Sequence, residues 1–164
     1  VSVNLSARRL DDAGFRARLD KLEFRSGSLS FELLESIFLD DCDGTVIENL
    51  RAIRDRGIGI EIDDFGTGHA SIVSLVRIAP GTFKIARELT ERIVEAPEQR
   101  GLVGSIIDIG KSLHINVVAE GVETAEHVAI LRDLGCDILQ GFALAAPMPF
   151  DALPDFVRRQ SWRG

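Results

Sequence analysis

The sequence predicts an α/β fold with a parallel sheet, and three observations support this. Strand-like runs alternate with helical patterns six times along the 164 residues, which favours parallel strands joined by right-handed crossovers. Neither a low-complexity segment nor a linker rich in proline and glycine divides the chain, whose length fits one domain. A polar or charged side chain stands near the carboxyl end of every predicted strand. In a (β/α) barrel of the TIM type those ends meet on one face, so this barrel is the expected architecture.

Short apolar runs bounded by turn-forming residues predict the strands. The expected strands are residues 1–5, 29–34, 58–62, 82–85, 116–119 and 137–140. A closed barrel of this type has eight strands and typically about 250 residues. Six strands therefore predict an incomplete or open barrel unless another segment or chain completes it.

Helical patterns fill the segments between the predicted strands. Ser6 and Thr124 are expected to cap the helices that follow them, and Gly57 is expected to end the helix that precedes it. The predicted helices are residues 6–22, 44–56, 70–76, 87–94, 102–113 and 124–135, with a last amphipathic helix after Pro149.

Composition excludes several classes of function. A formal charge of −7 argues against a footprint on polymeric nucleic acid, because such binding depends on clustered lysine and arginine. Cys42 and Cys136 have neither C-x-x-C spacing nor a histidine in register, so zinc, redox and disulfide roles are weakly supported and a reducing cytoplasm fits best. No run of about 18 apolar residues and no signal-peptide pattern occurs, so we expect no membrane segment here. The parent protein could still be membrane-tethered.

Two adjacent carboxylates, Asp63 and Asp64, follow the third predicted strand and precede Gly66-Thr67-Gly68. Such a pair is a poor choice for packing but suits a divalent cation beside a movable loop. The glycine-containing element is too short to cradle a phosphate and lacks the lysine of a P-loop, so we interpret it as a hinge.

The other predicted strands also end in residues fit for chemistry: Asn4, Glu32, Lys84, Glu120 and Gln140. Taken singly, a strand-end carboxylate usually caps the next helix or lies in solvent. Because the coincidence recurs on all six strands, a shared site on one face of a barrel explains it better.

Several strings of this sequence resemble a known family. VNLSARRL, FELLES, DDFGTG, FKI, VVAEGVET, LGCD and QGF are similar, in order and approximate spacing, to the EAL domains of bacterial signalling proteins. The resemblance covers nearly the whole chain. It implies a phosphodiesterase that hydrolyses cyclic di-GMP to a linear dinucleotide with Mg or Mn. It also implies fusion to sensor or GGDEF-type domains, and it leaves a homodimer open.

The same resemblance assigns roles to individual residues. Lys84 and Gln140 correspond to residues next to the scissile phosphate and its attacking water. Glu35 corresponds to the glutamate that holds the DDFGTG loop, and Glu123 corresponds to the second glutamate of EGVET. The expected catalytic set is Lys84, Gln140, Glu35 and Glu123. The implied metal ligands are Asn4, Glu32, Asp63, Asp64 and Glu120.

The chemistry of these residue types agrees with that assignment. Carboxylate and amide oxygens favour Mg or Mn over zinc, and no histidine or cysteine stands at a strand end to compete. Two ions about 3.5 to 4 Å apart would supply a hydroxide near neutral pH and screen the phosphoryl oxygens. Lys84 would stabilise the deprotonated water or a phosphate oxygen, or would alternatively form a salt bridge to a carboxylate. Gln140 could orient the water or merely satisfy a backbone group.

The sequence also departs from the family pattern. The Glu-Ala-Leu motif belongs to a segment before VNLS, so residues 1–164 are expected to form a partial EAL domain, the C-terminal two thirds of the barrel. Ala86 stands where the family usually has aspartate. Glu61 stands where relatives usually carry a small apolar residue. There it would point into the barrel and need a partner, water or an incompletely packed interior. The QGFALAAP segment lacks the usual serine and arginine.

The leading hypothesis is metal-dependent hydrolysis of cyclic di-GMP by the complete parent domain. The rival is a degenerate EAL domain that binds cyclic di-GMP or a protein partner without turnover. Ala86 favours the rival, whereas the five retained oxygen ligands favour the enzyme. A purely structural fragment is the third reading. For residues 1–164 alone we expect no appreciable turnover, because one metal ligand would be missing.

Overall fold

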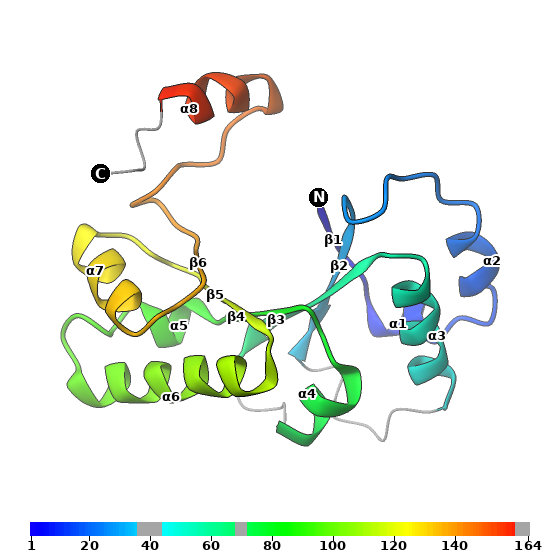
Figure 1. Cartoon of the computed structure of the whole chain (residues 1–164), viewed down its shortest axis with the longest axis horizontal. Coiled ribbons are helices and arrows are strands. Elements are labelled where there is room, and N and C mark those ends of the chain that lie inside the picture. Colours follow the sequence, from blue (N-terminus) through cyan, green and yellow to red (C-terminus); the bar gives the residue numbers. More distant parts are fainter. Residues whose placement is uncertain (36–43, 68–71, 160–164) are drawn as a thin grey trace.

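The computed structural model describes residues 1–35, 44–67 and 72–159. Six parallel strands lie in one sheet in the order of the sequence (Figure 1). They are β1 (Ser2–Asn4), β2 (Ser30–Leu34), β3 (Gly59–Phe65), β4 (Thr82–Ile85), β5 (Asn116–Ala119) and β6 (Ile138–Leu139). The predicted α/β fold with a parallel sheet is thus confirmed. Among the described strands β1 and β6 do not pair with each other, so the sheet is an open arc.

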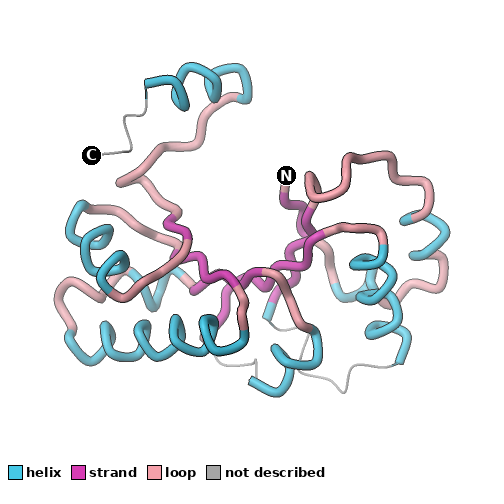
Figure 2. The backbone as a smooth tube through the Cα atoms, in the orientation of Figure 1, coloured by secondary structure: helices cyan, strands magenta, loops and turns pink. Residues whose placement is uncertain are grey.

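The helices follow the convex side of this curved sheet, except η2 (Phe150–Ala152) and α8 (Leu153–Arg159), which stand away from the body (Figure 2). None of the residues of α8 is buried. The described helices include none with the length and apolar content needed to cross a bilayer. Their bounds are α1 (Ala7–Leu10), α2 (Phe15–Leu19), α3 (Gly44–Asp55), α4 (Ile72–Ile78), α5 (Arg87–Thr90), α6 (Pro97–Leu113), α7 (Ala125–Asp133), the 3-10 helix η2 (Phe150–Ala152) and α8 (Leu153–Arg159).

One face of the sheet carries the apolar core. Successive side chains of a strand point to opposite faces, so the apolar side chains of β2 to β5 that point to the convex side meet the helices. Burying each such side chain stabilises the fold by about 1.5 to 3 kcal/mol. The core includes Phe31, Leu33, Ile60, Ile62, Phe83, Ile85 and Val117 from the sheet, and Leu50, Ile53, Leu75, Ile78, Val103, Ile107 and Leu131 from the helices.

The opposite, concave face carries polar residues. Strand register places five of them in one row across β1 to β5, where each is the Cα partner of the next. Register partners on parallel strands point to the same side of the sheet, so the row faces away from the apolar core. The five residues are Asn4, Glu32, Glu61, Thr82 and Asn116.

The helix expected over residues 6–22 is wrong, because two short helices, α1 and α2, occupy this segment. Between them the carboxylate of Asp12 accepts a hydrogen bond from the backbone N–H of Gly14 at 2.7 Å. Such a local turn competes with helix continuation. Ser6 stands at the N-cap position of α1, but its side chain makes no capping hydrogen bond.

Other boundaries differ by a few residues. Strand β3 runs to Phe65, beyond the expected end at residue 62, and α5 stops at Thr90 although a helix was expected to residue 94. Helix α6 begins at Pro97, five residues early, because proline is favoured in the first helical turn. Thr124 caps α7 as predicted, with its hydroxyl oxygen accepting from the N–H of His127. Residues 70–71 of the expected helix 70–76 lie outside the described residues.

Candidate functional site

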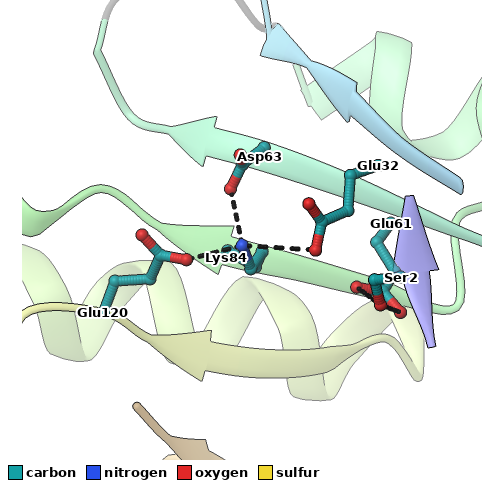
Figure 3. A network of polar contacts seen from close by, with 6 residues as sticks. All are labelled: Ser2, Glu32, Glu61, Asp63, Lys84 and Glu120. Atoms are coloured by element: carbon teal, nitrogen blue, oxygen red, sulfur yellow. Dashed lines mark hydrogen bonds and ion pairs between the residues drawn. The ribbon is translucent and has the colours of Figure 1, made fainter. Parts of the chain in front are cut away.

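Lys84 lies at the centre of a polar cluster on the concave face. Its Nζ is 2.6 Å from Oε1 of Glu120, 3.0 Å from Oδ1 of Asp63 and 3.5 Å from Oε1 of Glu32 (Figure 3). These carboxylates come from β2, from β3 and from the residue directly after β5. These three carboxylates are 31 to 88 residues apart in the sequence, and the fold brings them together around one buried ammonium group.

The ammonium of Lys84 is a fixed positive charge. Burial by itself would lower the pKa of Lys84, but the hydrogen bonds to Glu120 and Asp63 outweigh it and raise this pKa above its usual value. The side chain is thus protonated at neutral pH. Of the two roles expected for Lys84, the structure shows the salt bridge, which Lys84 forms with three carboxylates. The other role, next to a phosphate, stays a prediction.

Asp63, Asp64 and Glu120 offer carboxylate oxygens that all lie within 4.8 Å of one another. Asp64 has a left-handed backbone with φ of 56°, a conformation that aspartate tolerates better than most residues and that often marks a functional site. Burial and the neighbouring charge of Asp63 raise the pKa of the Asp64 carboxyl. Together with Glu32 the cluster has four carboxylates, three of which pair with the ammonium of Lys84. This set of hard oxygen ligands fits Mg²⁺ or Mn²⁺.

Asn4 is less closely joined to this cluster. It ends the edge strand β1, is exposed, and stands beside Glu32 in the sheet register. It also lines a separate cavity of about 510 Å³ with Arg9 and Phe15. The structure therefore aligns Asn4 with the predicted ligands but does not place it among the three grouped carboxylates.

A cavity of about 370 Å³ adjoins the cluster at Glu120. Gln140 and Glu123 line it together with Glu120, and their parts in a reaction stay predictions. Its wall also contains a second kind of charge, the guanidinium of Arg87, and one aromatic ring, that of Phe142.

Glu123 forms an ion pair with Arg87, whose Nη2 lies 2.7 Å from Oε1 of Glu123. The Nε of Arg87 also lies 3.7 Å from Glu91. Sequence reasoning missed Arg87. The available signal was its position, because it begins the helix that directly follows the strand of Lys84.

Glu35 supports the segment that follows Asp64. Its buried carboxylate accepts hydrogen bonds from the backbone N–H of Thr67 at 3.0 Å and from its hydroxyl at 2.9 Å. This is the contact that the resemblance implied, although the part of Glu35 in a reaction stays a prediction. The hinge expected at Gly66-Thr67-Gly68 also stays a prediction, because Gly68 lies outside the described residues.

Glu61 has a hydrogen-bond partner on the concave face. The hydroxyl of Ser2 donates to both carboxylate oxygens of Glu61, at 3.1 and 3.2 Å (Figure 3). The contact joins β1 to β3 across β2, which the curvature of the sheet allows. Ser2 was not among the predicted site residues, and no motif marks it.

The sequence model of the EAL domain matches residues 1–147. The chain belongs to the EAL domain family. Its curated relatives include the bifunctional diguanylate cyclase/cyclic di-GMP phosphodiesterase MucR of Pseudomonas aeruginosa, which is 36% identical over 159 residues. The cyclic di-GMP phosphodiesterase NbdA of the same organism is 33% identical over 162 residues. The alignments cover 93% and 96% of this chain but only 23% of MucR and 21% of NbdA.

Solved structures of EAL proteins have the same fold. The MucR phosphodiesterase in complex with cyclic di-GMP superposes with a TM-score of 0.82 at 36% identity, covering 93% of this chain and 63% of that one. Bd1971 bound to cAMP and cyclic di-GMP gives 0.87 at 29% identity, covering 95% and 42%. The manganese and cyclic di-GMP complex of Klebsiella pneumoniae BlrP1 gives 0.80 at 30% identity, covering 89% and 38%. The predicted fold of the EAL family is thus confirmed.

Proposed function

We propose that this EAL domain is part of a metal-dependent phosphodiesterase that hydrolyses cyclic di-GMP to the linear dinucleotide in bacterial signalling. The observation that carries the proposal is the convergence of Glu32, Asp63 and Glu120 on Lys84, with Asp64 beside them. The relatives MucR and NbdA are named cyclic di-GMP phosphodiesterases, and BlrP1, which is similar in fold, was solved with manganese and cyclic di-GMP.

The proposed metal ligands are the residues with oxygen atoms at this rim. When bound, two divalent ions would lower the pKa of an attacking water and screen the phosphoryl oxygens. The grouped oxygens of Asp63, Asp64 and Glu120 support this assignment directly. Four carboxylates beside a single ammonium leave negative charge that divalent cations would neutralise. The full proposed set is Asn4, Glu32, Asp63, Asp64 and Glu120.

Lys84 and Gln140 would act on the reacting groups. The ammonium of Lys84 provides a permanent positive charge that would stabilise a phosphoryl oxygen as negative charge grows on it. The amide of Gln140 both donates and accepts hydrogen bonds, so it would orient the attacking water from the wall of the cavity. Glu35 would act indirectly, by holding the Thr67 segment next to Asp64.

The test is to incubate the full-length protein that contains this sequence with cyclic di-GMP and Mg or Mn, and to follow the linear dinucleotide by chromatography. We expect product from the wild type. The Glu120→Gln variant should lose at least about 100-fold in rate, because even residues behind the ligands cost 10- to 100-fold. The matched control is Glu126→Gln, an exposed glutamate in the first turn of α7, which should keep the wild-type rate. Equal rates for the two variants would contradict the proposed site.

A binding module without turnover is the second candidate, and one position favours it. Ala86 is fully buried directly after β4, where the family resemblance implies an aspartate, so the expected carboxylate is missing. Under this reading the full-length protein binds cyclic di-GMP but releases no linear product in the same assay. Absence of both binding and product would overturn the two candidates together.

The context of the domain is also a proposal. The bifunctional name of MucR supports fusion to a GGDEF-type or sensor domain. A cytoplasmic location would give the site access to the cyclic dinucleotide. A homodimer remains part of the proposal and is tested by light scattering on the full-length protein.

A further inference from the structure

Two segments of the chain meet where Lys84 contacts Glu120. One runs from β4 into α5 and carries Lys84 and Arg87. The other, residues 120–124, joins β5 to α7 and carries Glu120 and Glu123. The Nζ of Lys84 lies 2.6 Å from Glu120, and the guanidinium of Arg87 lies 2.7 Å from Glu123. The side chains of this second pair are 58% and 42% exposed, so it holds the two segments together only weakly.

A buried histidine makes a further contact between the same segments. His127 belongs to the first turn of α7 and is 7% exposed. Its Nε2 lies 3.2 Å from the backbone oxygen of Glu91, the residue directly after α5, and its Nδ1 lies 2.8 Å from the hydroxyl oxygen of Thr124. Because the last carbonyls of a helix lack partners within the helix, a side-chain donor suits the Glu91 oxygen.

The partners of His127 indicate which ring nitrogen donates. A carbonyl oxygen only accepts, so Nε2 donates to Glu91, and Nδ1 of the neutral ring accepts from the hydroxyl of Thr124. The Thr124 oxygen accepts in turn from the backbone N–H of His127, at 3.3 Å. The ring therefore connects the N-cap of α7 to the end of α5.

Residues 120–124 are tied to the segment after β6 as well. The N–H of Val122 donates to the backbone oxygen of Gln140 at 3.1 Å, and the N–H of Ala143 donates to the oxygen of Val122 at 2.9 Å. The approach is close, because a Cβ at Gly141 would lie 2.2 Å from the Val122 oxygen. A shift of residues 120–124 would thus displace Gln140 together with Glu120.

We propose that His127 is a positioning residue for the metal site: by joining Thr124 to the backbone of Glu91, its imidazole holds the segment of Glu120 against the segment of Lys84. This inference rests on the proposed function, because the place of Glu120 matters to a cation only if the site binds one. The described residues that line the cavity beside Glu120 do not include His127, so His127 acts through the segment it holds.

Two variants separate this role from packing alone. The amide nitrogen of glutamine is as many bonds from Cβ as Nε2 of histidine, so His127→Gln keeps a donor for the Glu91 carbonyl. The amide oxygen of asparagine is as many bonds from Cβ as Nδ1, so His127→Asn keeps an acceptor for Thr124 and loses the bond to Glu91.

The test uses the full-length protein that contains this sequence. Mn²⁺ affinity is measured by electron paramagnetic resonance titration, and hydrogen exchange of the Val122 amide is measured without metal. We expect His127→Asn to weaken Mn²⁺ binding about 10-fold, the lower end of the range for residues behind metal ligands. The Val122 amide should exchange about 5- to 10-fold faster, as the loss of one hydrogen bond predicts. His127→Gln should stay close to the wild type in both measurements.

The control is Leu134→Ala, at the C-cap of α7, where the side chain packs partly against the core. This change removes packing at the opposite end of the same helix, so it should lower the Tm. It should leave the Mn²⁺ affinity and the exchange of the Val122 amide at the wild-type values.

Three results would overturn the role of His127 and leave the phosphodiesterase standing. They are a wild-type Mn²⁺ affinity in His127→Asn, an equal loss in His127→Asn and His127→Gln, and an equal loss in Leu134→Ala. If the wild type binds no Mn²⁺ and releases no linear dinucleotide, the proposed function fails. The exchange of the Val122 amide in the metal-free protein then still decides whether His127 holds the segment, so the two failures are distinguishable.

Discussion

Replacing Lys84 by methionine tests how the carboxylate cluster is held. The Lys84 side chain is 10% exposed, and those of Glu32, Asp63 and Glu120 are 15%, 18% and 20% exposed. Removing one partner from an ion pair this buried costs about 3 to 5 kcal/mol, because the remaining charges lose their compensation. Methionine preserves most of the apolar stem, so little packing is lost. In a domain of this size 1 kcal/mol corresponds to about 2 to 4 °C, which predicts a fall in Tm of roughly 6 to 20 °C.

Thermal unfolding followed by circular dichroism, with and without MgCl₂, measures this effect. Because Lys84→Met leaves the carboxylates uncompensated, Mg²⁺ should raise the Tm of the variant more than that of the wild type. An ion at 100 times its Kd stabilises a protein by about 2.7 kcal/mol, enough to recover much of the loss.

The control is Lys111→Met, which breaks an ion pair to Asp108 whose side chains are 47% and 75% exposed. An exposed pair of this kind contributes about 1 kcal/mol or less. The reasoning is refuted if the Lys84 and Lys111 variants lose the same Tm, or if the Lys84 variant shows no larger response to Mg²⁺ than the wild type.

Three further predictions concern single contacts. Glu35→Ala should speed hydrogen exchange of the Thr67 amide about 10- to 100-fold, because it removes a charge-assisted hydrogen bond; an unchanged rate contradicts this. Gly66→Ala should lower the free energy of unfolding by at least about 1 kcal/mol in urea titrations, because φ is 96° and the new Cβ would lie 2.5 Å from Cδ1 of Leu89; Leu89→Ala in the same chain should recover part of the loss. Burial raises the pKa of the Cys136 thiol, so at pH 8 iodoacetamide should modify it more slowly in the folded protein than in urea, as measured by mass spectrometry of its peptide; equal rates would count against this.

Much of the fold was predictable because its signals are local. The strands 82–85 and 116–119 were predicted with the bounds that the structure shows, since each is a short apolar run between turn residues. The cap at Thr124 was also predictable, because a threonine before a helical pattern supplies the hydroxyl oxygen that accepts from the backbone. Where a polar side chain bonds to the backbone nearby, as Asp12 does to Gly14, the helical pattern was misleading.

The grouping of Glu32, Asp63 and Glu120 around one rim was predictable for a topological reason. Parallel strands place their carboxyl ends at the same edge of a sheet, so residues at those ends become neighbours whatever their separation in sequence. The end of β3 was harder to predict, because strand pairing continues through Asp63, opposite Leu34, to Phe65, opposite Ile85. The apolar pattern in the sequence does not predict this pairing, because Asp63 and Asp64 interrupt the pattern after Ile62.

The sequence by itself determined the order of strands and helices and the set of oxygen-bearing side chains at the strand ends. Only the tertiary structure decided which of these groups touch. Lys84 forms ion pairs with three carboxylates, and Arg87 forms an ion pair with Glu123 in the wall of a cavity. The hydroxyl of Ser2 donates a hydrogen bond to Glu61 across strand β2. The physical reason is that period-two alternation tells which face a side chain takes, whereas distances between strands follow from the curvature of the whole sheet.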